Sequence, residues 1–170
     1  PVECIYEANL MVIGEEAVGK TSLAKKIKDP DYRLDLGPLS TEGIDILRWT
    51  FLFNDKQFSI RIWDFGGQEI YHATHQFFLT RRTLYVLVVD PRKENVDLDY
   101  WLGTVEILTG GSPVLIVKNE KRERTCQINE RALRAEFPNV KEILSTNLAT
   151  NRGLSNIVET IKQYISQLDH

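Results

Sequence analysis

Three short runs of hydrophobic residues stand out along the chain, at residues 8–13, 83–89 and 114–117. Within each run almost every position is apolar, without the alternation that marks a strand with one wet face. Each run is flanked by charged residues, glycine or proline. This pattern predicts buried strands at Ala8–Ile13, Thr83–Val89 and Val114–Val117, and a last strand at Val140–Leu144.

The segments between these strands show the periodicity of helices. Lys20–Lys28 follows the first strand and is closed by Asp29-Pro30, because proline does not continue a helix. Apolar residues at 98, 101, 105 and 108 repeat at helical spacing, and a shorter helix is predicted at Asn129–Glu136. The clearest apolar stripe follows Gly153 and consists of Leu154, Ile157, Val158, Ile161, Ile165 and Leu168. Strands that alternate with helices predict an α/β fold, a doubly wound and mostly parallel sheet with helices on both faces.

Residues 44–65 depart from this alternation. Two strand-like segments, Ile44–Phe53 and Gln57–Phe65, flank Asn54-Asp55-Lys56, whose composition is typical of a turn. We therefore expect an antiparallel hairpin that adds one antiparallel edge strand to the sheet.

The composition of the chain limits the classes of protein to which it can belong. The chain has 170 residues, of which 42% are hydrophobic, enough for the core of one domain over residues 1–170. Because it begins at Pro1, we expect a domain excised from a longer multidomain protein. The formal charge of −3 argues against nucleic-acid binding through net charge, and no apolar run reaches the roughly 18 residues of a membrane span. Two widely spaced cysteines, Cys4 and Cys126, form no disulfide framework and favour a reducing, cytoplasmic setting.

The segment between the first strand and the first helix matches the phosphate-loop pattern G-x-x-x-x-G-K-[ST]. Glycines let the backbone turn its N–H groups toward an anion, and the helix N-terminus adds partial positive charge. Lys20 would reach the β- and γ-phosphates, and the Thr21 hydroxyl would bind Mg²⁺. The candidate nucleotide-binding residues here are Gly14, Glu15, Glu16, Ala17, Val18, Gly19, Lys20, Thr21 and Ser22.

Two carboxylates in this loop are unusual beside a polyphosphate. If Glu15 and Glu16 point to solvent, as glutamates usually do, their cost is small. A Glu16 carboxylate that leans toward the γ-phosphate would instead weaken binding or hydrolysis by charge repulsion.

Candidates for metal and γ-phosphate contacts follow the second strand of the hairpin. Mg²⁺ keeps several waters, so we expect Asp64 to act on it through one of them. Gly67 would bring its N–H to the γ-phosphate, and Gln68 would orient the attacking water. Thr41, in the polar loop before the hairpin, would complete the Mg²⁺ shell and be released when the γ-phosphate is lost.

These motifs resemble a Ras-like small GTPase domain and, more narrowly, the Roc domain of Roco proteins. The resemblance is carried by GEEAVGKT (14–21), STEGIDI (40–46) and above all WDFGGQEIYHATHQFFLTRRTLYVLVVD (63–90), and it covers nearly the whole chain. It implies a six-stranded Ras-like fold, Mg²⁺-dependent hydrolysis of GTP to GDP and a switch role. It also implies a COR domain in the same full-length chain and a homodimer. The catalytic residues would then be Gln68, Lys20 and Thr41.

The guanine-reading motif of that family, N-K-x-D, is only partly present. Asn119 matches its Asn, but Glu120 stands in place of Lys and Arg122 in place of Asp. Without that Asp the guanine donors lose an acceptor, at roughly 1–3 kcal/mol, and Arg accepts no hydrogen bond. Glu120 or Glu123 would substitute if the loop shifts by one residue, and otherwise the choice between guanine and adenine stays open.

Ser145-Thr146-Asn147 stands where the family carries a short turn whose backbone N–H contacts the base carbonyl. Ser145 matches that turn and Asn147 does not, so an ordinary strand-to-loop turn is an equal alternative. Ser145 and Thr146 join Asn119 and Gly67 as candidates for nucleotide binding.

Other polar residues near these motifs have two interpretations each. His72 and His75 suit a surface helix turn better than a catalytic base. Arg81-Arg82 would either neutralise transition-state charge across a dimer or pack against a partner domain. Trp49 and Trp101 are expected in the core or at an interface.

The leading functional hypothesis is a nucleotide-hydrolysing switch with slow intrinsic turnover. Glu16 and the missing Asp leave two alternatives. One is a degenerate nucleotide-binding or dimerisation scaffold with little hydrolysis, and the other is an ATP-preferring enzyme of the same phosphate-loop class.

Overall fold

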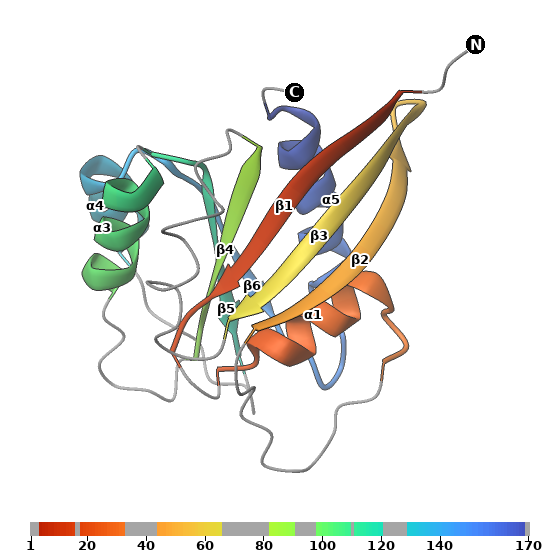
Figure 1. Cartoon of the computed structure of the whole chain (residues 1–170). Coiled ribbons are helices and arrows are strands. Elements are labelled where there is room, and N and C mark those ends of the chain that lie inside the picture. The colour runs from red at the N-terminus through yellow and green to blue at the C-terminus, as the bar shows by residue number, and fades with distance from the viewer. Residues whose placement is uncertain are drawn as a thin grey trace.

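The computed structural model describes residues 4–15, 18–32, 44–65, 82–90, 98–109, 111–120 and 129–168. Six strands form one sheet in the order β2-β3-β1-β4-β5-β6 (Figure 1). They are β1 (Ile5–Ile13), β2 (Ile44–Phe53), β3 (Lys56–Phe65), β4 (Thr83–Val89), β5 (Val114–Asn119) and β6 (Val140–Thr146). The described helices are α1 (Lys20–Lys28), α3 (Leu98–Thr109), α4 (Glu130–Glu136) and α5 (Leu154–Ser166).

The pairing of the strands confirms the predicted α/β fold. β1 pairs in parallel with β3 and β4, and β4, β5 and β6 follow one another in parallel. β2 pairs antiparallel with β3 at the edge of the sheet. All seven residues of β4 are buried, which explains why its sequence is apolar without alternation.

The connection between β2 and β3 is tighter than predicted. Lys56 pairs with Phe53 and opens β3, so the expected three-residue connection is wrong and only Asn54 and Asp55 form the turn. Both have positive φ, 50° and 62°. Positive φ at both central residues gives a turn whose twist matches the flanking strands, and Asn and Asp adopt this conformation more readily than most residues.

Strand and helix ends also differ from the sequence prediction. β1 begins earlier, at Ile5, and β5 and β6 run on to Asn119 and Thr146, which pair with each other. Backbone pairing thus carries polar residues into both strands, and apolar periodicity does not detect it. As a result Ser145 and Thr146 end the last strand instead of following it. Asn129 lies outside α4 as its N-cap and accepts a hydrogen bond from the Ala132 amide.

Helices cover both faces of the sheet (Figure 1). α1 and α5 pack on one face through residues such as Leu23 and Ile161, in the core that also buries Trp49. α3 and α4 pack on the other face through residues such as Trp101 and Leu133. Both tryptophans lie in the core, as expected. Among the described helices, none has the length and apolar character needed to cross a membrane.

Candidate functional site

Polar residues gather where the parallel strands reach their carboxyl ends. Gly14 follows β1, Asp64 lies near the end of β3, Asp90 follows β4, and Asn119 and Thr146 end β5 and β6. The side chains that are at most 1% exposed are those of Asp64, Asp90, Asn119 and Thr146. Ligands of open α/β sheets bind at this edge. It is therefore the candidate functional site.

Lys20, the first residue of α1, hydrogen-bonds back to the start of the phosphate loop. Its Nζ donates to the carbonyl oxygens of Gly14, at 2.6 Å, and Glu15, at 2.9 Å, and the residue is 6% exposed. Gly19 is the N-cap of α1, with no side-chain cap and no acidic residue in the first turn. The first N–H groups of the helix thus keep their partial positive charge available to an anion.

Thr21 and Asp64 meet beside this loop. The Thr21 hydroxyl donates to Asp64 Oδ2 and joins the first turn of α1 to β3. Within the described ranges, no group of three or more His, Cys, Asp or Glu side chains is placed to hold a metal ion. A hydroxyl and a carboxylate nevertheless fit Mg²⁺, which takes few protein oxygens and completes its shell with water and substrate phosphates.

Asn119 links β5 to the phosphate loop. Its Nδ2 donates to the Val18 carbonyl oxygen at 2.9 Å, and its buried Oδ1 has no hydrogen-bond partner in the described structure. An unpaired buried acceptor costs about 1–3 kcal/mol, which a ligand donor would recover. Gly19 is required for this packing, because a Cβ there would lie 2.4 Å from Asn119 Nδ2 and its φ is 102°.

The residue after Asn119 is a carboxylate that is already paired. Glu120 Oε1 accepts from Arg152 Nη2 at 2.7 Å, and the two side chains are 8% and 56% exposed. Arg152 occupies one of the two carboxylate oxygens of Glu120, so any donor from a base would share this carboxylate with Arg152. Sequence reasoning missed Arg152, which lies 32 positions away and belongs to no motif.

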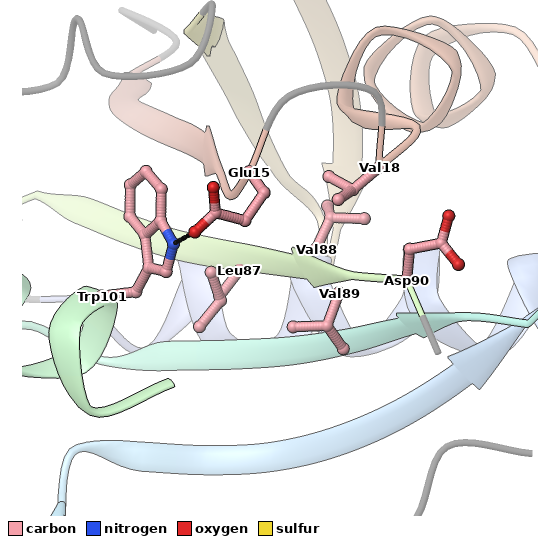
Figure 2. A pocket seen from close by; sticks show the side chains of 7 residues that line it. All are labelled: Glu15, Val18, Leu87, Val88, Val89, Asp90 and Trp101. Carbon is pink, nitrogen blue, oxygen red and sulfur yellow. Dashed lines mark hydrogen bonds between the residues drawn. The ribbon is translucent and has the colours of Figure 1, made fainter. Parts of the chain in front are cut away.

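Glu15 is half-buried and faces α3 instead of solvent. Trp101 Nε1 donates to Glu15 Oε1 at 3.0 Å, as Figure 2 shows. The contact closes one side of a small pocket between the loop, β4 and α3, lined by Glu15, Val18, Leu87, Val88, Val89, Asp90 and Trp101. The expectation of a solvated carboxylate is thus wrong for Glu15, and Trp101 has a polar contact in addition to its place in the core.

The remaining predicted residues divide into two groups. Ser22 is half-buried in α1, Ser145 is half-buried in β6, and the buried Thr146 donates its hydroxyl to the Arg152 carbonyl oxygen at 2.8 Å. Arg82 is exposed and precedes β4, at the opposite end of that strand from the site. Outside the described residues lie Glu16, Ala17, Thr41, Gly67, Gln68, His72, His75, Arg81, Arg122 and Glu123.

Comparisons with known proteins agree with this geometry. The sequence model of the family described as "Ras of Complex, Roc, domain of DAPkinase" matches residues 9–122. The chain is 28% identical to the probable serine/threonine-protein kinase pats1 of Dictyostelium discoideum, over 96% of this chain and 6% of that protein. It is 29% identical to a Roc-COR-CHAT protease of Runella zeae, over 98% of this chain and 20% of that protein.

A solved structure shares the fold over nearly the whole chain. It is the structure of Methanosarcina barkeri Roco2 RocCORdC bound to GDP, with a TM-score of 0.84 and 35% identity. The match covers 96% of this chain and 50% of that one, so our chain spans half of the solved protein and a smaller share of the curated relatives. The family match extends from β1 past the end of β5 and includes the phosphate loop, Thr21 and Asp64, and this chain belongs to the Roc family of Ras-like domains.

Proposed function

We propose that this Roc domain binds guanine nucleotide together with Mg²⁺, hydrolyses GTP to GDP slowly and acts as a molecular switch. The observation that carries the proposal is the arrangement at the start of α1, where Lys20 lies inside the loop and Thr21 is bonded to Asp64. The GDP bound to the Roco2 relative supports guanine as the base.

The phosphates would be held by the loop from Gly14 to Ser22. Backbone N–H groups would surround them, and the Lys20 ammonium would neutralise charge on the β- and γ-phosphates. Thr21, Thr41 and, through a water, Asp64 would hold Mg²⁺, which supplies a Lewis acid at the phosphate oxygens when bound.

The remaining contacts concern the reacting water and the base. Gln68 would orient the water for in-line attack, and the Gly67 N–H would contact the γ-phosphate. Asn119, Ser145 and Thr146 would contact the base, an assignment supported by the pairing of Asn119 with Thr146 at the end of β5 and β6.

In the full-length protein we propose that a COR domain accompanies this domain and that the protein forms a homodimer. The name of the Runella relative joins Roc with COR, and the solved Roco2 chain is a RocCOR structure of which our chain matches half.

We also propose a reducing compartment such as the cytoplasm. The sequence contains two cysteines, Cys4 and Cys126, and such a low cysteine content is typical of proteins in that setting.

A titration of melting temperature with GDP and with ADP tests the binding site. GDP at about 100 times its Kd adds about 2.7 kcal/mol to the free energy of unfolding, or roughly 5–10 °C for a chain of this size. ADP should give a smaller shift. Lys20→Ala should abolish the GDP shift, and Lys28→Ala, at the exposed end of the same helix, should retain it.

An unchanged GDP shift in Lys20→Ala would show that the phosphate site is misassigned. A larger shift with ADP than with GDP would favour the ATP-preferring alternative. No shift with either nucleotide would favour a scaffold that holds none.

A further inference from the structure

The loop between β6 and α5, residues 147–153, is held from two sides, and we call it the base-side loop. On one side Lys26 of α1 donates from Nζ to the Leu148 carbonyl oxygen and to Asn151 Oδ1, each at 2.5 Å. On the other side Glu120 holds Arg152 at 2.7 Å. The loop is therefore fixed between α1 and the end of β5.

Lys26 makes an unusual buried contact. The residue is 4% exposed, and the partners of its ammonium in the described structure are two neutral oxygens. Buried ammonium groups are rare because desolvation is costly, and those that persist are normally paired with a carboxylate. An ionised donor forms hydrogen bonds roughly twice as strong as a neutral one. The charge of Lys26 thus strengthens the two hydrogen bonds that position the loop.

The base-side loop is hydrogen-bonded directly to the end of β6. The Thr146 hydroxyl and the Asn147 amide both donate to the Arg152 carbonyl oxygen, at 2.8 and 3.0 Å. Gly153 has a φ of 77°, and a Cβ there would lie 2.3 Å from the Ser145 carbonyl oxygen. Ser145 and Thr146 are therefore in direct contact with the loop that Lys26 holds.

We propose that Lys26 is a positioning residue for the nucleobase, acting through Leu148 and Asn151 on the Ser145–Thr146 end of β6. α1 would then serve both parts of one ligand. Its first turn faces the phosphates, and Lys26, about 9 Å further along the helix axis, sets the base contacts. This inference rests on the proposed function, because it assumes that Ser145 and Thr146 contact the base.

The test compares GDP with a ligand that has phosphates and no base. Lys26→Met keeps the aliphatic stem and removes the ammonium, and Lys28→Met is the matched control on the exposed end of α1. Affinities for GDP and for inorganic tripolyphosphate are measured with Mg²⁺ by calorimetry. Lys26→Met should weaken GDP binding about tenfold, the equivalent of losing one or two net hydrogen bonds. Its tripolyphosphate affinity should stay within about twofold of the wild-type value, as should both affinities of Lys28→Met.

A second variant tests the same contact if Lys26→Met does not fold. Asn151 has a φ of 61°, so Asn151→Gly preserves the backbone conformation while removing the Oδ1 that accepts from Lys26. The substitution also removes the Asn151 Nδ2 donation to the Pro30 carbonyl oxygen. It should weaken GDP binding a few-fold, in the same direction as Lys26→Met, and spare tripolyphosphate.

Two results would overturn the proposal. Equal losses of GDP and tripolyphosphate affinity would mean that Lys26 supports the phosphate site or the fold as a whole. Unchanged GDP affinity in both variants would mean that the base-side loop is positioned without Lys26. Failure of the proposed function looks different, because wild-type protein would then bind GDP no better than Lys20→Ala does.

Discussion

Tyr85 illustrates how a residue's surroundings decide its chemistry. It lies in β4 at 1% exposure, packed in the core beneath α3 and α4, and its hydroxyl has no hydrogen-bond partner in the described structure. Burial raises the pKa of Tyr85 from 10.0 to about 12. The hydroxyl is therefore a cost to the folded state, and that cost grows once the unfolded chain begins to ionise.

Tyr85→Phe tests this cost through the pH dependence of stability. Below pH 10 the phenol is protonated in both states, and removal of the hydroxyl should raise the free energy of unfolding by up to about 1 kcal/mol. Above pH 10 the unfolded state ionises first, so the wild-type chain loses stability as pH rises toward 12. At pH 11 the loss from this residue is about 1.4 kcal/mol, and the variant escapes it.

Urea unfolding of both proteins at pH 8, 9, 10 and 11 measures the difference. The pKa of Tyr164 is also raised, by burial and then by its hydrogen bond to Glu142, but this contribution is common to both proteins. An equal decline in stability with pH in the two proteins would contradict the assignment to Tyr85.

At the same scale, the site residues separate into those that sequence reveals and those that it does not. Lys20, Thr21 and Asp64 were predicted because phosphate and Mg²⁺ binding demands particular residue types at fixed spacing, and the structure brings them together. Lys26 and Trp101 were not predicted as site residues. Their partners lie 122 and 86 positions away, and no local pattern encodes such contacts.

Among the elements, strand centres were predicted more accurately than strand ends. Burial dictates an apolar run in β4, and its predicted limits, Thr83 and Val89, are the observed ones. The ends of β5 and β6 depend instead on the pairing of Asn119 with Thr146, and both residues are polar. The ends determine the site, since these two residues lie at the candidate base contacts.

Helix α3 is coupled to the phosphate loop by the bond between Trp101 and Glu15. The contact holds a carboxylate on the α3 side of the loop (Figure 2). A carboxylate released from that side would be free to approach the phosphates, and repulsion of a unit charge several ångströms away is on the order of 1 kcal/mol with partial screening. We therefore expect Trp101 to protect nucleotide binding from Glu15.

A double-mutant cycle measures this protection. Trp101→Phe keeps an aromatic ring in the core and removes the N–H, and it should weaken GTP binding a few-fold. In a Glu15→Gln background the same substitution should have little effect, because the charge is gone. The coupling energy from the four affinities should be about 1 kcal/mol. Equal losses in both backgrounds would instead point to a packing defect.

Across the whole molecule, the two ends of the parallel strands have different roles. The phosphate loop, Thr21, Asp64 and the base-side loop lie at the carboxyl ends of the parallel strands. The start of β1 and the β2–β3 turn lie at the opposite end of the sheet (Figure 1). Arg82 lies at that opposite end, where its carbonyl oxygen accepts from the backbone N–H of Asn9. The length of β4, roughly 20 Å, separates it from the site. Arg82 therefore does not reach a nucleotide held by its own Lys20, which favours a partner surface or a role across a dimer.

This separation predicts slow turnover by the isolated domain. Among the cationic residues that the structure describes near the site, Lys20 contacts the carbonyl oxygens of the phosphate loop, whereas Lys26 and Arg152 are bonded to the base-side loop and to Glu120. Related enzymes gain about 10³–10⁵ in rate from an added arginine, so phosphate release from GTP in a single turnover should take minutes to hours. Gln68→Leu should slow it at least about tenfold, and Arg82→Ala should leave the rate of dilute protein unchanged. A loss of rate in dilute Arg82→Ala would contradict the position of Arg82 at the far end of β4 from the site. GDP binding without any phosphate release from the wild-type domain would instead support the scaffold alternative, because the nucleotide would then be held without being hydrolysed.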